Sequence, residues 1–288
     1  MAIASGSRVR HYLVEGEIGV GGTSTVWSAR DERTGTRLAL KVLNVSDTPD
    51  AARLRLWREA QALRAIKHPA IVPLRDVFDY DSTPVLVMEL LQGETLRSLL
   101  VREHSVSVSR AAQLLIPIAE ALSEAHAVGF VHRDLKPENI FVETSEADGA
   151  RHERVRLLDF GVTRSFAPSE STDETPITAL GSLIGTIAYM APEQALHPSD
   201  SDPRVDVWSF GVTLYELLSG CRPFEGDTKP EVMRQLLVGG ITPLSVLCPE
   251  LPPDIAHLVM TLLSRNPQRR PASLEPASSV LRAHLLHP

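Results

Sequence analysis

Cysteine is scarce in this chain, and no apolar run in it is long. The two cysteines, Cys221 and Cys248, are too few for a disulfide framework, so we expect free thiols in a reducing compartment, for which the cytoplasm fits best. No stretch continues long enough without charge or proline to span a bilayer, and the first residues turn polar too early for a signal peptide. The composition therefore predicts a chain without a membrane segment.

Basic charge is not in excess either. The 288 residues include 36 acidic and 29 basic ones, which gives a formal net charge of -7. Nucleic acid is not an expected partner, because phosphate contacts need a concentrated basic surface and no basic stripe occurs. Only four of the basic residues are lysines, at positions 41, 67, 136 and 229. Arginine is thus the usual surface cation, whereas positions 41 and 136 keep the compact point charge of a lysine.

The first third of the chain has the pattern of an antiparallel sheet. Short apolar runs alternate with glycine and polar turns from position 11 to position 43. Helical spacing follows from 50 to 66 and ends at His68-Pro69, and two further strand-like runs lie at 71–78 and 85–91. The pattern predicts a small lobe, residues about 12–91, built from strands and one main helix.

After Gln92-Gly93 the pattern becomes helical. Helices are predicted at 94–101, 109–128, 203–219, 229–237 and 253–264, and Pro117 inside the second of them predicts a kink. The polar stretch 143–154 is interpreted as an enlarged hairpin turn. A larger, mainly helical lobe, residues about 92–282, is therefore expected, and with 43% hydrophobic residues each lobe is large enough to bury its own core.

A glycine-rich turn lies within the first predicted strands. It comprises Ile18, Gly19, Val20, Gly21, Gly22, Thr23, Ser24, Thr25 and Val26. Glycines without a Cβ let backbone amides approach phosphate oxygens, although a plain hairpin is the alternative explanation. Further along, Lys41 lies on an apolar strand, where a buried ammonium needs an anionic partner. Glu59 on the following helix is the candidate partner, unless it is an ordinary exposed glutamate.

Three strings in the second half carry the strongest signal. They are His132-Arg133-Asp134-Leu135-Lys136-Pro137-Glu138-Asn139, then Asp159-Phe160-Gly161, then Ala191-Pro192-Glu193. In this order, after Lys41 and Glu59, they resemble the motifs of eukaryotic-type protein kinases, and 185–194 is similar to the bacterial serine/threonine branch. The resemblance covers about residues 12–282. It implies an α+β, bilobal protein kinase fold with an antiparallel-sheet N-lobe and a mainly helical C-lobe.

The resemblance also implies a role for each charged residue of these strings. Asp134 would be the catalytic base, Lys136 would reach the γ-phosphate of ATP, and Lys41, held by Glu59, would bind the α and β phosphates. These residue types suit phosphoryl transfer, which needs positioning and one proton acceptor rather than covalent catalysis. The implied product is a phosphorylated serine or threonine of a protein substrate.

Cofactor contacts follow from the same resemblance. Asn139 and Asp159 provide hard oxygen ligands for Mg²⁺, with Mn²⁺ as the alternative ion. The adenine would be enclosed by Ile18, Val26, Ala39, Met88 and Phe141, although apolar residues at these positions are also consistent with plain core. Backbone groups of Glu89 and Leu91 would hydrogen-bond to the adenine. Asp206 is expected to anchor the catalytic loop, and Glu193 to pair with Arg270.

Regulation and partners are expected from the family alone. A phosphate on Thr178, or on Thr175 or Ser182, would pair with Arg133 and order the activation segment. A homodimer through the small lobe and a membrane tether beyond this chain are further expectations. Two other classes stay open, a pseudokinase that acts as a scaffold and a small-molecule phosphotransferase of the same fold.

Overall fold

The computed structural model describes residues 3–21, 24–43, 49–81, 83–147, 150–159, 185–197 and 202–285. The chain divides into two compact units. The first comprises Met1–Lys67 and Ile71–Gln92, and the second comprises His68–Ala70 and Gly93–Pro288. In the described part of the chain, no helix is both long and apolar enough to cross a membrane.

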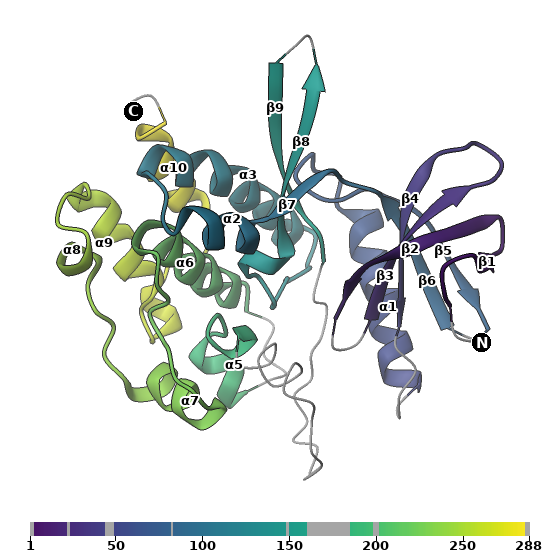
Figure 1. The fold of residues 1–288 in the computed structure, drawn as a ribbon. Coiled ribbons are helices and arrows are strands. Elements are labelled where there is room, and N and C mark those ends of the chain that lie inside the picture. Colours follow the sequence, from purple (N-terminus) through teal and green to yellow (C-terminus); the bar gives the residue numbers. More distant parts are fainter. Residues whose placement is uncertain are drawn as a thin grey trace. The chain divides into compact units, whose positions relative to one another are not determined.

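The first unit is built on one antiparallel sheet with the strand order β1-β2-β3-β4-β6-β5 (Figure 1). The strands are β1 (Arg8–Val9), β2 (Tyr12–Val20), β3 (Ser24–Asp31), β4 (Arg37–Leu43), β5 (Leu74–Tyr80) and β6 (Thr83–Glu89). Helix α1 (Pro49–Ala65) packs on β4, β5 and β6. The predicted meander and its single main helix are confirmed, with helix bounds that differ by one residue.

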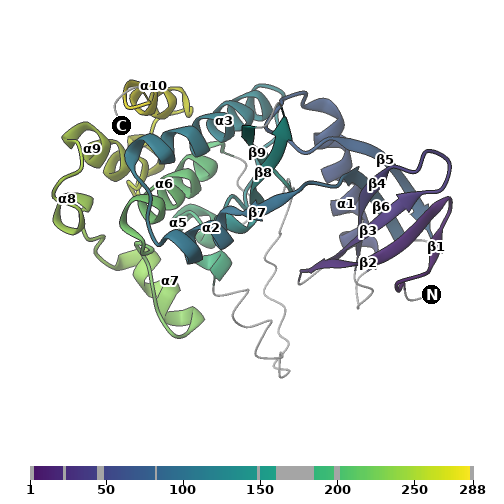
Figure 2. The same cartoon turned by 45° about the horizontal axis from the view of Figure 1, so that its top comes forward.

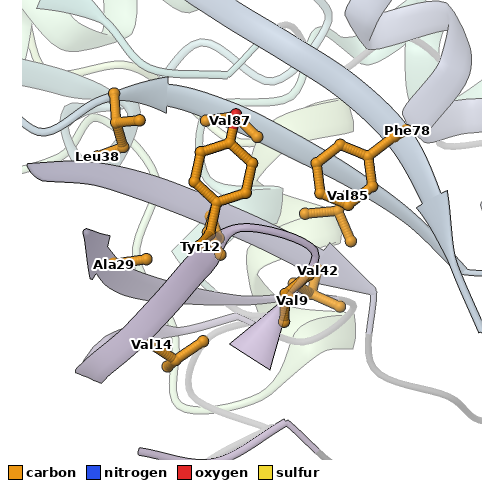
Figure 3. Packing of buried hydrophobic residues seen from close by; sticks show 10 residues of the cluster. Val9, Tyr12, Val14, Ala29, Leu38, Val42, Phe78, Val85 and Val87 are labelled. Carbon is orange, nitrogen blue, oxygen red and sulfur yellow. The ribbon is translucent and has the colours of Figure 1, made fainter. Parts of the chain in front are cut away.

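The two faces of this sheet differ in chemistry because side chains alternate along each strand. Leu38, Leu40 and Val42 of β4 point into a hydrophobic cluster that also contains Tyr12 and Phe78, whose rings stack at 5.9 Å (Figure 3). Ala39 and Lys41 lie between these residues in sequence, so they belong to the opposite face. Burial of the apolar cluster thus determines the direction in which Lys41 points.

The second unit is mainly helical. Its helices are α2 (Leu96–Glu103), α3 (Val108–Ala127), α5 (Pro192–Leu196), α6 (Arg204–Ser219), α7 (Lys229–Val238), α8 (Leu244–Leu247), α9 (Pro253–Leu262) and α10 (Glu275–Ala283), with short 3-10 turns η1 (Pro137–Asn139) and η2 (Pro267–Arg269). The five helices predicted from the sequence are all present. Helix α10, which packs along α3, was not predicted (Figure 2).

Helix α6 forms the centre of the second unit. Every residue from Val205 to Leu218 is buried, including Asp206 and Glu216, and α3, α8 and α9 pack around the helix. Helix α3 is also largely buried and continues as one helix through Pro117. The buried acidic residues of α6 therefore require partners inside the unit.

The polar stretch 143–154 is not an enlarged turn, and this interpretation was wrong. Strands β8 (Ile140–Ala147) and β9 (Ala150–Leu157) pair in register from Ile140↔Leu157 to Ala147↔Ala150, and β7 (Gly93–Thr95) pairs with the base of β8. The ribbon extends beyond β7 (Figure 1). The polar pattern concealed the strands because both faces of the outer ribbon are solvated, whereas ladder pairing needs only backbone groups.

Candidate active site

In the first unit, the candidate nucleotide-binding residues lie on one face of the sheet. Val26 is directly opposite Lys41, and Ala39 is directly opposite Met88. Residues that face each other across an antiparallel pair share a face, and Ala39 and Lys41 share one by their spacing. Strands β3, β4 and β6 therefore place these four side chains on the face opposite the hydrophobic cluster.

Lys41 and Glu59 form the expected ion pair. Lys41 Nζ donates to Glu59 Oε1 at 2.9 Å and to Oε2 at 3.2 Å, and both side chains are less than one-tenth exposed. The pair joins β4 to α1. Since both carboxylate oxygens accept from the same ammonium, the lysine is held at a single position on the sheet.

The glycine-rich turn closes the ladder between β2 and β3. Gly19 lies opposite Val26, and the Gly21 N–H donates to the Ser24 carbonyl at 2.8 Å. Among the described residues, no atom lies within 4 Å of a Cβ built on Gly19, so packing does not require glycine there. Gly22 and Thr23, two of the predicted phosphate-contacting residues, lie outside the described part.

The remaining nucleotide-binding candidates are divided between the units. Ile18 is 52% exposed, whereas Met88 is buried and Glu89 is half-buried. Leu91 is half-buried and follows β6 in the first unit. Phe141 belongs to the second unit, where it lies opposite both Thr95 of β7 and Arg156 of β9.

In the second unit, Asp206 anchors the segment that contains Asp134. The two carboxylate oxygens of Asp206 accept from the backbone N–H groups of His132, at 2.8 Å, and Arg133, at 2.7 Å. His126 Nε2 lies 2.7 Å from the same carboxylate. The expected anchoring role of Asp206 is confirmed, and α3 and α6 both contribute to it.

Asp134, Lys136 and Asn139 form one hydrogen-bonded group. Lys136 Nζ donates to both carboxylate oxygens of Asp134 at 3.0 Å and to Thr186 Oγ1 at 2.9 Å. Asn139 Nδ2 donates to the Asp134 carbonyl at 2.7 Å and to its Oδ2 at 3.3 Å. Asp134 is thus oriented by two neighbours of the same loop, and the lysine links the loop to the segment that contains Thr186.

Asn139 and Asp159 lie at the base of the β8–β9 hairpin. Ile140 pairs with Leu157, and the Leu158 N–H donates to the Asn139 carbonyl at 2.9 Å, so the pairing continues to Asn139 and to the residue before Asp159. The Asn139 amide commits its nitrogen to Asp134, which directs its oxygen to other partners. One amide oxygen and one carboxylate fit Mg²⁺, which prefers a few hard oxygen ligands and keeps several waters.

Among the residues that the structure describes, no group of three or more histidine, cysteine, aspartate or glutamate side chains is arranged to hold a metal ion. Cys221 and Cys248 are both free thiols, as expected.

Two buried groups near the loop have shifted pKa values. Complete burial lowers the pKa of His132, and the nearby charges of Asp206, Asp134 and Asp159 only partly oppose this. Burial raises the pKa of Asp206, but hydrogen bonds from His126 and Arg133 and the charge on His126 outweigh it and leave this pKa below its usual value. His132 is therefore neutral and Asp206 charged near neutral pH.

A second charged cluster was not predicted from the sequence. Arg97 of α2 pairs with Glu138 of η1 and Glu216 of α6, both at 2.8 Å, and the Tyr189 hydroxyl bonds to Glu216. Burial, then Glu216, raises the pKa of Tyr189 well above its ordinary value. The available signal was Glu216 itself, an acidic residue within an apolar helical run.

The predicted pair of Glu193 and Arg270 is present. Arg270 Nη1 and Nη2 donate to the two carboxylate oxygens at 2.5 Å and 2.8 Å, and the Arg270 side chain is fully buried. The guanidinium also lies 4.8 Å from the centroid of the Trp208 ring. This bidentate pair holds α5 against η2 and α6.

Comparison with known proteins gives this site a family. Residues 12–284 match the protein kinase domain, and the chain belongs to that family, whose members generally use ATP and Mg²⁺. The predicted kinase fold, with a sheet-bearing unit and a helical unit, is confirmed.

Similar curated proteins are bacterial serine/threonine-protein kinases. PknL of Mycobacterium bovis is 38% identical over 260 residues, which cover 90% of this chain and 62% of PknL. PknA of Mycobacterium tuberculosis is 36% identical over 278 residues, 94% of this chain and 61% of PknA. Pkn2 of Myxococcus xanthus is 36% identical over 269 residues, 92% of this chain and 31% of Pkn2. The chain thus resembles the bacterial branch, as predicted, and spans about three fifths of the first two relatives.

Proposed function

We propose that this domain transfers the γ-phosphoryl group of ATP to serine and threonine hydroxyls of proteins, with Asp134 as the catalytic base. The observation on which this rests is the arrangement of Asp134, Lys136, Asn139 and Thr186 in one hydrogen-bonded group. Together they supply the groups that phosphoryl transfer needs. Asp134 is a proton acceptor, Lys136 a cation and Asn139 an oxygen ligand, and Thr186 adds a hydroxyl on the proposed acceptor side.

Asp134 orients the incoming hydroxyl and accepts its proton. Its carboxylate is held by Lys136 and Asn139, so little reorganisation is needed when the hydroxyl binds. Lys136 Nζ, which already bonds Asp134, lies where it can stabilise negative charge on the transferred group. Lys136 and Thr186, which bond to each other, favour serine and threonine acceptors by resemblance, because tyrosine kinases usually have an Ala-Ala-Arg-type sequence in place of the lysine region.

We propose that residues of the first unit bind the nucleotide, and the adenine contact of Phe141, a residue of the second unit, stays a prediction. Lys41, fixed by Glu59, would bind the α and β phosphates, and the glycine-rich turn would contribute backbone N–H groups. Gly19 is consistent with this, because no atom of the described residues lies within 4 Å of a Cβ built there. Asn139 and Asp159 would hold Mg²⁺, or Mn²⁺ as the alternative, which when bound neutralises phosphate charge.

The decisive experiment is radiolabel transfer from ATP to a generic basic protein, followed by phosphoamino-acid analysis. Wild-type protein with Mg²⁺ should yield phosphoserine and phosphothreonine. Asp134→Asn should lower the rate by about 10²- to 10⁴-fold, the range for removing a general base. Lys41→Met is a second inactive control.

The other classes give different results in the same assay. Equal background for wild type, Asp134→Asn and Lys41→Met would favour a scaffold without transfer. Label in small molecules but not in protein would favour a small-molecule phosphotransferase.

Further aspects stay predictions. We propose that residues about 12–91 and about 92–282 are the two lobes of one kinase domain. Autophosphorylation is expected at Thr178, or at Thr175 or Ser182, all outside the described residues, and mass spectrometry of ATP-treated protein tests it. A homodimer through the small lobe and a place in the cytoplasm, within a longer tethered protein or free, are likewise proposed by family resemblance.

A further inference from the structure

Arg133, which precedes the proposed catalytic base, has an unusual backbone. Its φ is +66°, in the left-handed region that non-glycine residues rarely adopt. Such a conformation persists only where the surroundings hold it in place. The N–H of Arg133 is held by Asp206 at 2.7 Å, which accounts for one side of the residue.

Gln194 of α5 holds the other side. Its Nε2 donates to the Arg133 carbonyl at 2.9 Å, and its Oε1 accepts from the Ala191 N–H at 3.2 Å. The orientation of the amide is determined by these partners, because reversing it would place oxygen against the carbonyl and nitrogen against the N–H. Both ends of one half-buried side chain are therefore used.

The Arg133 carbonyl belongs to the peptide group that leads into Asp134. At the other end of that group, the Asp134 N–H donates to His132 Nδ1 at 3.3 Å. The carbonyl of Asp134 itself accepts from Asn139 at 2.7 Å. Gln194 thus completes a set of bonds that fixes the backbone on both sides of the Asp134 Cα, and it is the member that comes from α5.

We propose that Gln194 is a positioning residue that couples the segment 185–194 to the orientation of Asp134. This inference rests on the proposed kinase function. Thr186 also bonds this segment to the loop, through the side chain of Lys136, whereas Gln194 bonds to the loop backbone. A shift of the segment would therefore change the direction of the Asp134 carboxylate, and turnover would fall without a change in nucleotide binding.

The test compares two nearly isosteric variants, Gln194→Glu and Gln194→Met, across pH. Loss of the donor should lower kcat by roughly tenfold, the equivalent of one ordinary hydrogen bond, with KM for ATP unchanged. In Gln194→Glu the carboxylate faces a carbonyl oxygen, which raises its pKa above the ordinary value of about 4.3. Once protonated, it can donate again. The ratio of Gln194→Glu to wild-type kcat should rise as the pH falls from about 8 to about 5.5, and the Gln194→Met ratio should stay flat.

The control is Gln113→Glu, at an exposed position of α3 beside Arg110, which makes the same change of charge in the same unit. It should match wild type. If the wild type transfers phosphate, two results would overturn the positioning role and leave the kinase function standing. One is a Gln194→Glu kcat equal to the wild-type kcat. The other is a lowered Gln194→Glu kcat whose ratio to the wild-type kcat does not vary with pH. A wild-type protein without transfer would instead remove the proposed function, and this inference with it.

Discussion

At the scale of single residues, the buried pair of Lys41 and Glu59 connects stability to chemistry. Removing one member leaves the other charge buried without its partner, and such losses commonly amount to about 3–5 kcal/mol. Removing both charges in favour of apolar groups of similar size is often nearly neutral. The unfolding free energies of a single and a double variant therefore separate the effect of removing one charge from that of removing both.

We expect Lys41→Met to lower the unfolding free energy by about 3 kcal/mol and Lys41→Met/Glu59→Leu to recover most of that loss, because the second change removes the stranded carboxylate. Chemical denaturation of the two variants checks this. Phosphoryl transfer should be absent from both. A double variant no more stable than Lys41→Met alone would contradict the buried-pair interpretation.

Asn139 has a comparable double role, as proposed metal ligand and as donor to Asp134. Asn139→Ala should raise the Mg²⁺ concentration for half-maximal transfer by about tenfold or more, since a ligand oxygen is lost. Titration of activity with Mg²⁺ measures this. Asn266→Ala, which removes only the cap of η2, is the matched control and should leave the Mg²⁺ requirement unchanged.

At the scale of elements, the packing of α6 against α9 depends on a glycine. A Cβ on Gly211 would lie 2.8 Å from Leu262 Cβ and 3.3 Å from Leu263 Cδ2. Alanine has a helix propensity about 1 kcal/mol better than glycine, whereas overpacking a core typically costs about 1–3 kcal/mol. The contact is with a Cβ rather than a flexible side-chain end, so the overpacking should dominate.

Gly211→Ala should therefore lower the unfolding free energy by about 1 kcal/mol in a denaturant titration, despite the better helix former. Gly240→Ala provides the comparison, because a Cβ at Gly240 meets no described atom within 4 Å. It should be neutral or slightly stabilising. A stabilised Gly211→Ala would mean that α6 and α9 separate easily.

Elements differed in how well the sequence predicted them. The helices with strong apolar periodicity, such as α3 and α9, were predicted to within two residues at each end. The sequence pattern predicted a turn where the β8–β9 ribbon lies, because strands that are solvated on both faces have no apolar face. Helix α10 is too short, at nine residues, to be stable by itself, and its packing on α3 supplies the stability that an isolated helix of this length lacks.

At the scale of the whole molecule, proton binding to buried groups should shape stability. The pKa of His132 is lowered by burial, so the unfolded chain takes up its proton first as the pH falls. The stability that His132 contributes is fully present above about pH 6.5, the pKa of a histidine in the unfolded chain. It is lost as the pH falls from there to the lower pKa of His132 in the folded state. The stability that Asp206 contributes is likewise lost as the pH falls, but only below about 3.9, the pKa of an aspartate in the unfolded chain.

Unfolding free energy measured by denaturant should therefore fall from about pH 6.5 downward, by at most about 1.4 kcal/mol per pH unit for one group. In His132→Phe this part of the slope should be reduced, because no proton is taken up at position 132. The absolute stability of the variant is not the readout. An identical slope in wild type and variant would assign the pH dependence to other groups.

The sequence by itself determined the family of this chain. The residue types at 134, 136, 139 and 159, with their order and their spacing, identify the protein kinase family and predict phosphoryl transfer, which restricts the side chains that can occupy these positions. Only the tertiary structure decided which buried groups meet. Asp206 reaches the loop from 73 positions away, Arg97 reaches Glu216 across 119, and Gln194 reaches Arg133 across 61. Such contacts depend on how whole helices pack around α6, and neither periodicity nor local propensity specifies that packing.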